Sequence, residues 1–208
     1  EMQRSLVGSE MCIRDRFWPS DNTDPIERLF IQWGFSQVFP AKTMCAHVTT
    51  WNKNSSVKFR TDVAMMCKLG FDIKLADMSK DDETYCRTAV QNYNRLKPVV
   101  LEGDMYRLVS PYGSNHTSTM YVGKDKDKAA VFAFDIHPRY AEKILPVRLQ
   151  GLDADKMYRV KEINLMPGAN SSLSGNGEVF SGEFLMNVGL NLFTAQQLNS
   201  RVIEVVAE

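Results

Sequence analysis

The sequence predicts an α/β part followed by an all-β part, and three observations lead to this prediction. Helix-capping residues and apolar residues at helical spacing dominate residues 17–98. A short apolar segment between two of these helices is typical of a buried strand. Beyond about Val100, apolar and polar residues alternate, and clusters of Gly, Asn, Asp and Lys recur at short intervals. The first pattern favours an α/β arrangement and the second an antiparallel β-sandwich.

The first helix is predicted to begin at Pro25. Asp24 precedes it as an N-cap, and Glu27 follows the cap by three residues. Its apolar residues recur at helical spacing and are Ile26, Leu29, Phe30 and Trp33.

Residues 39–48 predict a short buried strand, with a loop at residues 49–56 on its C-terminal side. We expect a second helix from Thr61 to near Gly70. A third helix is expected from the cap Ser79 onward and is predicted to stop at Pro98, because proline removes a helical hydrogen bond.

The second part reads as strands separated by turns. Four segments have strand character, namely residues 120–122, 129–136, 158–161 and 201–206. Three segments read as turns or loops, namely residues 124–128, 151–156 and 168–172.

The charge balance argues against several classes of partner. Lys and Arg number 25, as do Asp and Glu, so the chain has no basic field for nucleic acid and no acidic tail. No apolar run approaches the roughly 20 residues of a membrane span. The four cysteines, Cys12, Cys45, Cys67 and Cys86, show no metal-binding spacing and are expected to be free thiols. A neutral small molecule is therefore the expected partner.

Residues 5–16 resemble a translated sequencing adapter rather than a natural protein segment. On this interpretation residues 1–16 are a disordered artefact, and the genuine chain begins near Phe17.

The densest polar cluster of the chain lies at residues 18–25, and by itself it is most often a turn that leads into a helix cap. Its two aspartates differ, however. Asp24 directly precedes Pro25 and serves as the cap, whereas Asp21 has no such structural duty. A carboxylate between a strand and the following helix is where barrel enzymes place catalytic groups. A calcium loop is disfavoured because the glycine and the distal glutamate of that motif are missing.

The histidines are too far apart in sequence to predict a zinc site, so no metal is expected. His47 differs from His116 and His137 because it follows a predicted strand and could point toward a substrate. Arg60 and Asp62 are expected to form a helix cap or a surface ion pair.

Several motifs together are similar to the α-galactosidases of glycoside hydrolase family 36. They are Ser-Asp-Asn-Thr-Asp within residues 18–28, Ile-Gln-Trp-Gly at 31–34, Ala-His-Val at 46–48, and the segments 59–66, 94–98, 134–139 and 158–163. The resemblance covers the chain after Phe17. It implies that residues 17–100 are the last units of a TIM (β/α)8 barrel and that residues 101–208 are a C-terminal antiparallel β-sandwich.

The resemblance also implies roles for individual residues. Asp21 would be the general acid/base, and Trp18 and Ser20 would lie close to the galactose subsite. The nucleophile of the family lies on an earlier barrel strand, so this chain is expected to be an inactive C-terminal fragment of a retaining glycosidase. That chemistry requires no metal or organic cofactor.

The implied substrate is a small oligosaccharide with terminal α-linked galactose, such as raffinose or melibiose. Two alternatives stay open: a non-catalytic β-sandwich module that binds carbohydrate or a partner, and a family relative with another α-galactoside specificity. A homo-oligomer is considered for the full-length protein, and the expected location is the cytoplasm or periplasm of a bacterium.

Overall fold

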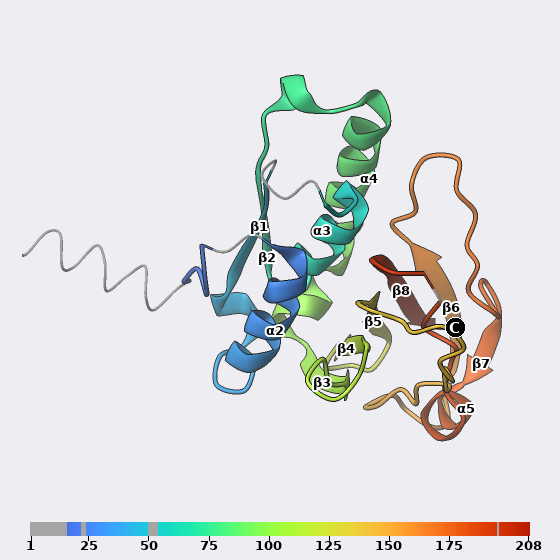
Figure 1. Ribbon diagram of the computed structural model, residues 1–208. Helices are drawn as coiled ribbons and strands as arrows, with labels where there is room; N and C mark the ends of the chain where they lie inside the picture. The colour runs from blue at the N-terminus through green and yellow to red at the C-terminus, as the bar shows by residue number, and fades with distance from the viewer. Residues whose placement is uncertain (1–15, 22–23, 50–53, 195) are drawn as a thin grey trace, which may run out of the picture.

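A computed structural model describes residues 16–21, 24–49, 54–194 and 196–208. It contains a small parallel sheet and a six-stranded antiparallel sheet, and helices α3 (Val57–Ala64) and α4 (Lys80–Glu102) lie between them (Figure 1). The predicted order, α/β first and antiparallel second, is confirmed. The prediction that residues 1–16 are an artefact falls almost entirely outside the described residues.

The first helix begins where its cap predicts. Helix α2 spans Pro25–Phe35, and the Asp24 side chain accepts hydrogen bonds from the backbone N–H groups of Ile26 and Glu27. These bonds satisfy donors that the first helical turn leaves without partners.

The predicted strand at residues 39–48 begins later than expected. The backbone N–H of Thr43 bonds to the carbonyl of Pro40 at 3.0 Å and closes the short 3-10 helix η1 (Ala41–Thr43). Strand β1 then covers Cys45–Thr49. Phe17 is bridged in parallel to Met44, which places the start of the described chain beside β1.

The prediction of a helix from Thr61 to near Gly70 is wrong at both ends. Ser56 caps α3, because its hydroxyl accepts a bond from the Phe59 N–H at 3.1 Å. The chain then forms strand β2 (Lys68–Asp72), which pairs in parallel with β1. Pairing with a strand some 20 residues away therefore decides the conformation around Gly70.

Helix α4 does not stop at Pro98, contrary to the sequence prediction. The helix starts after the predicted cap Ser79 and runs to Glu102 with Pro98 inside it. Pro98 is exposed, whereas Val99 and Val100 are buried in the core. Burial of these two side chains offsets the hydrogen bond that the proline removes.

The antiparallel sheet contains all four predicted strand segments to within one residue. Its strands are β3 (Asp104–Val109), β4 (His116–Val122), β5 (Lys128–Asp135), β6 (Met157–Ile163), β7 (Val179–Ser181) and β8 (Asn199–Ala207). They lie in the order β3-β4-β5-β8-β6-β7. Ser181 caps the short helix α5 (Gly182–Asn187).

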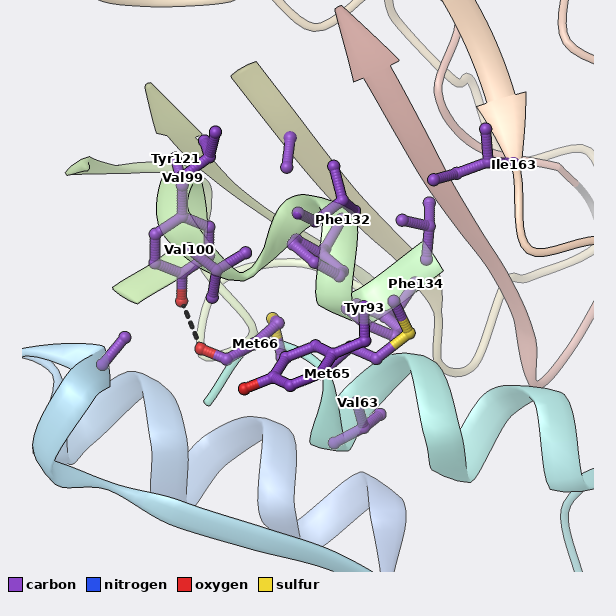
Figure 2. Close-up of a cluster of buried hydrophobic side chains, with 14 of the residues drawn as sticks. Val63, Met65, Met66, Tyr93, Val99, Val100, Tyr121, Phe132, Phe134 and Ile163 are labelled. Atoms are coloured by element: carbon purple, nitrogen blue, oxygen red, sulfur yellow. Dashed lines mark hydrogen bonds between the residues drawn. The ribbon is translucent and has the colours of Figure 1, made fainter. Parts of the chain in front are cut away.

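Both faces of the antiparallel sheet are covered. One face packs on α3 and α4, and Figure 2 shows Met66 and Tyr93 of the first part beside Tyr121 and Phe132 of the sheet. The Tyr121 hydroxyl also donates to the carbonyl of Met66 at 2.9 Å. The other face packs on α5 and on long loops, which contribute buried leucines at positions 149, 152, 173, 185, 190 and 192. The division of the chain near residue 100 stays a prediction, but the hydrophobic core is continuous across it.

Asp62 is not part of a cap or of a surface ion pair, so that expectation is wrong. It is fully buried in α3, and its carboxylate accepts bonds from Lys58 Nζ at 2.5 Å, Ser200 Oγ at 2.6 Å and the Tyr85 hydroxyl at 3.1 Å. Asn164 Nδ2 also donates to it. These donors satisfy the hydrogen-bonding capacity of a carboxylate that is cut off from water.

Arg60 forms no cap either. It lies within the first turns of α3, and its guanidinium donates to the carbonyl of Thr49 at the end of β1. Burial lowers the pKa of Arg60, and nearby Asp82 partly opposes this effect.

Candidate active site

Three segments of the first part run in the same direction. Phe17 is bridged in parallel to Met44 just before β1, and β1 is paired with β2 along its length. Phe17 therefore lies beside the amino end of β1, and strands β1 and β2 end at the same edge, at Thr49 and Asp72. Barrel enzymes carry their catalytic groups at this edge.

The structure gives the two aspartates after Phe17 different surroundings. Asp24 Oδ1 is 2.9 Å from the N–H of Ile26 and 3.1 Å from that of Glu27, so its carboxylate caps α2. Asp21 is exposed and lies before the cap. The prediction that Asp24 is the helix cap is confirmed, and Asp21 is exposed and close enough to Arg28 and His47 to affect the pKa of both.

Arg28 lies behind this loop on the inner face of α2. Its side chain is buried, with 3% exposure. One guanidinium nitrogen, Nη2, is 3.2 Å from the carbonyl oxygen of Ser20 and 3.4 Å from Nδ1 of His47. Burial lowers the pKa of Arg28, whereas the nearby thiol of Cys67 and the carboxylate of Asp21 act in the opposite direction.

His47 is held as a neutral ring. Burial lowers its pKa, the positive charge of Arg28 lowers it further, and Asp72 and Asp21 partly oppose both effects. A guanidinium can only donate hydrogen bonds, so Nδ1 of His47 must be the acceptor. The ring proton is therefore on Nε2.

Trp18 packs against His47. The two ring centroids are 4.7 Å apart and the ring planes meet at 86°. The indole is 52% exposed, so half of it remains open to solvent at the strand ends. Gly70 on β2 lies beside both rings, since a Cβ there would make ordinary van der Waals contact with the Cβ of His47 at 3.6 Å and with Cη2 of Trp18 at 3.9 Å.

A hollow of about 290 Å³ opens at the start of α3. Its lining includes Ser55, Ser56 and Arg60, which follow β1, and Ile73 and Asp77, which follow β2. It lies on the carboxyl side of both strands.

The predicted residues Trp18, Ser20 and Asp21 lie on one loop, and the structure adds His47 and Arg28 to them. The sequence prediction singled out His47 but missed Arg28. A signal was present, since Arg28 and Gln32 recur at helical spacing on the face of α2 that also buries Pro25 and Leu29. A charged residue on a buried helix face needs an explanation.

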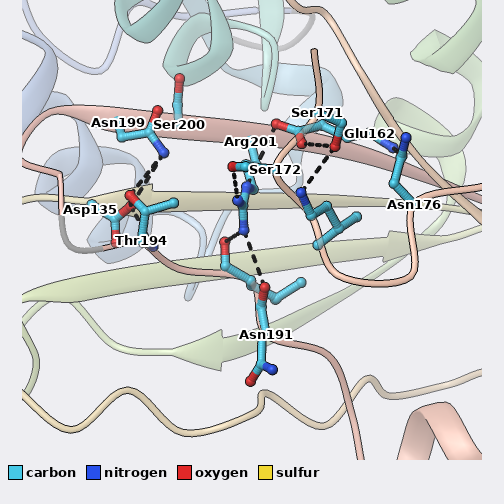
Figure 3. A network of polar contacts seen from close by, with 12 residues as sticks. Asp135, Glu162, Ser171, Ser172, Asn176, Asn191, Thr194, Asn199, Ser200 and Arg201 are labelled. Atoms are coloured by element: carbon cyan, nitrogen blue, oxygen red, sulfur yellow. Dashed lines mark hydrogen bonds and ion pairs between the residues drawn. The ribbon is translucent and has the colours of Figure 1, made fainter.

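The other two histidines lie elsewhere. His116 is buried in the sheet, with Nδ1 2.7 Å from Oδ1 of Asp135. Figure 3 shows the same aspartate surrounded by Thr194 and Asn199. His137 is exposed, and its Nδ1 lies 2.9 Å from the side-chain nitrogen of Gln197.

The described cysteines are free thiols, namely Cys45, Cys67 and Cys86. Burial raises the pKa of Cys67 to about 12, so this thiol remains protonated at neutral pH. Within the described ranges, no three His, Cys, Asp or Glu side chains form a group that could hold a metal ion. No helix in the described part of the chain is long and apolar enough to cross a membrane.

These features define a class of protein. Consecutive parallel βα units followed by an antiparallel β domain are the arrangement expected at the end of a barrel enzyme that carries a β domain behind its barrel. Two family descriptions match the chain: Melibiase over residues 7–103, and the glycosyl hydrolase family 36 C-terminal domain over residues 116–205. The chain belongs to glycoside hydrolase family 36.

Individual relatives agree with this assignment. Alpha-galactosidase 2 of Hypocrea jecorina is 34% identical over 192 residues, which cover 89% of this chain and 24% of that protein. The crystal structure of GH36 alpha-galactosidase AgaB from Geobacillus stearothermophilus superimposes with a TM-score of 0.80 at 28% identity, over 93% of this chain and 26% of that one. A variant of AgaA from the same organism, solved in complex with raffinose, gives a TM-score of 0.79 at 27% identity, over 91% of this chain and 25% of that one. The chain thus spans about a quarter of the length of these relatives.

Proposed function

We propose that the longer protein to which this chain corresponds is a retaining α-galactosidase that removes terminal α-linked galactose from oligosaccharides such as raffinose and melibiose. Family membership and the raffinose complex of a relative support this substrate class. The observation that carries the proposal is the placement of Asp21. Asp21 is exposed and lies close enough to Arg28 and His47 to affect the pKa of both, while Asp24 serves as the helix cap.

In this proposal Asp21 is the general acid/base. A retaining glycosidase uses two carboxyl groups about 5–5.5 Å apart, one as nucleophile and one as acid/base. Asp21 protonates the glycosidic oxygen as the leaving group departs and later removes a proton from the attacking water. An upstream barrel strand of the longer protein supplies the nucleophile.

Trp18 and Ser20 form part of the galactose site in this proposal. The exposed half of the Trp18 indole offers an apolar face of the kind that packs against a sugar ring. Ser20 lies between Trp18 and Asp21 in the sequence, and its carbonyl oxygen accepts a hydrogen bond from Arg28. The loop can therefore bring a stacking surface and an acid to the same sugar.

The partner proposed for this site is a neutral oligosaccharide. The equal numbers of acidic and basic residues, 25 of each, support an uncharged substrate over a polyanion. A homo-oligomer of the longer protein and a cytoplasmic or periplasmic location remain predictions of the sequence.

The test is a substrate panel for the longer protein. Raffinose, melibiose and nitrophenyl α-galactoside should be hydrolysed, with α-galactose as the first product seen by NMR. A nitrophenyl α-N-acetylgalactosaminide should be a poor substrate. Preference for that substrate would replace the proposed specificity, and β-galactose as the first product would contradict a retaining mechanism.

A further inference from the structure

Arg28 is a buried cation whose hydrogen-bond partners are both neutral. Its side chain is 3% exposed, and it donates to the Ser20 carbonyl and to the His47 ring. Its Nε is buried and has no hydrogen-bond partner among the described residues. The Asp21 carboxylate is near enough to raise the pKa of Arg28 but forms no ion pair with it. Burial of a charge without such a partner is costly, so folding by itself does not favour arginine at this position. Such costly arrangements concentrate at functional sites.

The two hydrogen bonds of Arg28 connect separate elements. Ser20 belongs to the loop after Phe17, His47 belongs to β1, and Arg28 itself lies on α2. A planar guanidinium has donors in a fixed fork, so it holds its partners in a defined relative orientation. The arginine therefore fixes the loop relative to the neighbouring strand.

The His47 ring passes this restraint on to Trp18. Its Nδ1 is occupied by Arg28, and its ring meets the indole edge to face at 4.7 Å. One guanidinium thus holds both Trp18 and Ser20. Trp18 lies three residues before Asp21, and Ser20 directly precedes it. On the other side of Asp21, the Asp24 cap fixes the start of α2.

We propose that Arg28 is the positioning residue of the acid/base loop: it fixes the Ser20 carbonyl and keeps His47 in the neutral Nε2–H tautomer against which Trp18 packs. This inference rests on the proposed function, because it assigns a purpose to a fixed geometry of Asp21. Arg28 itself touches neither the substrate nor the reacting atoms in this account.

The first test reads the tautomer directly in the chain. The ring-nitrogen chemical shifts of a histidine distinguish a protonated nitrogen from a bare one, and the chain has three histidines in all. The signals of His47 are identified by their loss in His47→Gln. At pH 7 we expect a bare Nδ1 and a protonated Nε2. A proton on Nδ1, or on both nitrogens, would overturn the inference without the need for any arginine variant.

The second test compares Arg28→Lys with Arg28→Met. Lysine keeps a charged donor, so it should retain the bare Nδ1, whereas methionine removes the donor and should let the ring proton redistribute between the two nitrogens. In Arg28→Met the ring protons of His47 should also lose the ring-current shift that Trp18 imposes, and Trp18→Leu should show the same loss. Arg87→Met on the exposed face of α4 is the matched control and should change neither signal.

The outcomes separate this inference from the proposed function. Unchanged tautomer and ring-current signals in a folded Arg28→Met would show that Arg28 does not position the loop. If both signals behave as expected but the longer protein hydrolyses galactosides without needing Asp21, the proposed role of Asp21 fails and the geometry of the loop stands.

Discussion

Asp62 on α3 accepts a hydrogen bond from the Ser200 hydroxyl on β8 at 2.6 Å, so a fully buried carboxylate joins the barrel units to the sheet. Lys58 completes the connection, because its ammonium contacts the carboxylate at 2.5 Å and the Ser200 carbonyl at 2.8 Å. The side chains of the ion pair are 12% and 0% exposed, so solvent screens this charge pair weakly.

Asp62→Ala should therefore destabilise the chain strongly. Removal of one partner leaves a buried ammonium and several donors without an acceptor, which costs about 3–5 kcal/mol. Glu83→Ala is the matched control, since its pair with Arg87 lies on an exposed helix face and is worth about 0.3–0.5 kcal/mol. Urea unfolding followed by circular dichroism measures both. Similar losses in the two variants would show that the buried network contributes little.

Protonation of His47 should make the chain less stable in mild acid. Burial and Arg28 lower its pKa in the folded state, whereas in the unfolded state it titrates near about 6.5. The unfolded state therefore binds the proton first as the pH falls, so the free energy of unfolding decreases from about pH 6.5 down through the lowered folded pKa.

The measurement compares urea midpoints at pH 7.5 and pH 5.5. The midpoint of His47→Gln should fall less than that of the unmodified chain, because the variant has no imidazole to protonate. His137→Gln, at an exposed position, should behave as the unmodified chain does. An equal fall for all three proteins would show that the folded state does not lower the pKa of His47.

The 208-residue chain on its own should not hydrolyse nitrophenyl α-galactoside. It holds the proposed acid/base, and the proposed nucleophile belongs to an upstream strand, so no glycosyl-enzyme can form. The assay is nitrophenol release across purification fractions. Activity that elutes with the chain and disappears in Asp21→Asn would mean that the second carboxyl group lies within these residues.

Local signals in the sequence predicted the starts of two helices. The sequence prediction missed strand β2 and the true end of helix α4, because both depend on contacts between distant residues. Asp24 and Ser79 are caps that act within one turn, so they could be recognised from sequence. Strand β2 carries no strong pattern of its own, and its residues are only partly buried. Its strand conformation depends on pairing with β1. Helix α4 continues past Pro98 because the sheet buries the residues beyond it.

The candidate site likewise has one part that the sequence could predict and one part that depends on tertiary packing. Trp18, Ser20 and Asp21 form a local motif that the resemblance could identify. The contact between Arg28 and His47 joins residues 19 positions apart on a helix and a strand, so it depends on how α2 packs on β1. Helical spacing alone could have marked Arg28 as buried, but it could not have identified its partner.

In the proposed mechanism Asp21, rather than Asp24, is the acid/base. Asp21→Ala in the longer protein should abolish most hydrolysis of raffinose, whose alcohol leaves poorly without protonation, and should spare the first step for a nitrophenyl galactoside. Asp24→Ala removes the cap of α2, so it should lower stability by about 0.5–2 kcal/mol and affect both substrates alike.

The most direct measurement is azide rescue of the Asp21→Ala protein with nitrophenyl α-galactoside. Azide needs no general base, so we expect restored turnover and α-galactosyl azide as the product, with no rescue in Asp24→Ala. Rescue and leaving-group dependence in Asp24→Ala, together with their absence in Asp21→Ala, would contradict the assignment of the acid/base.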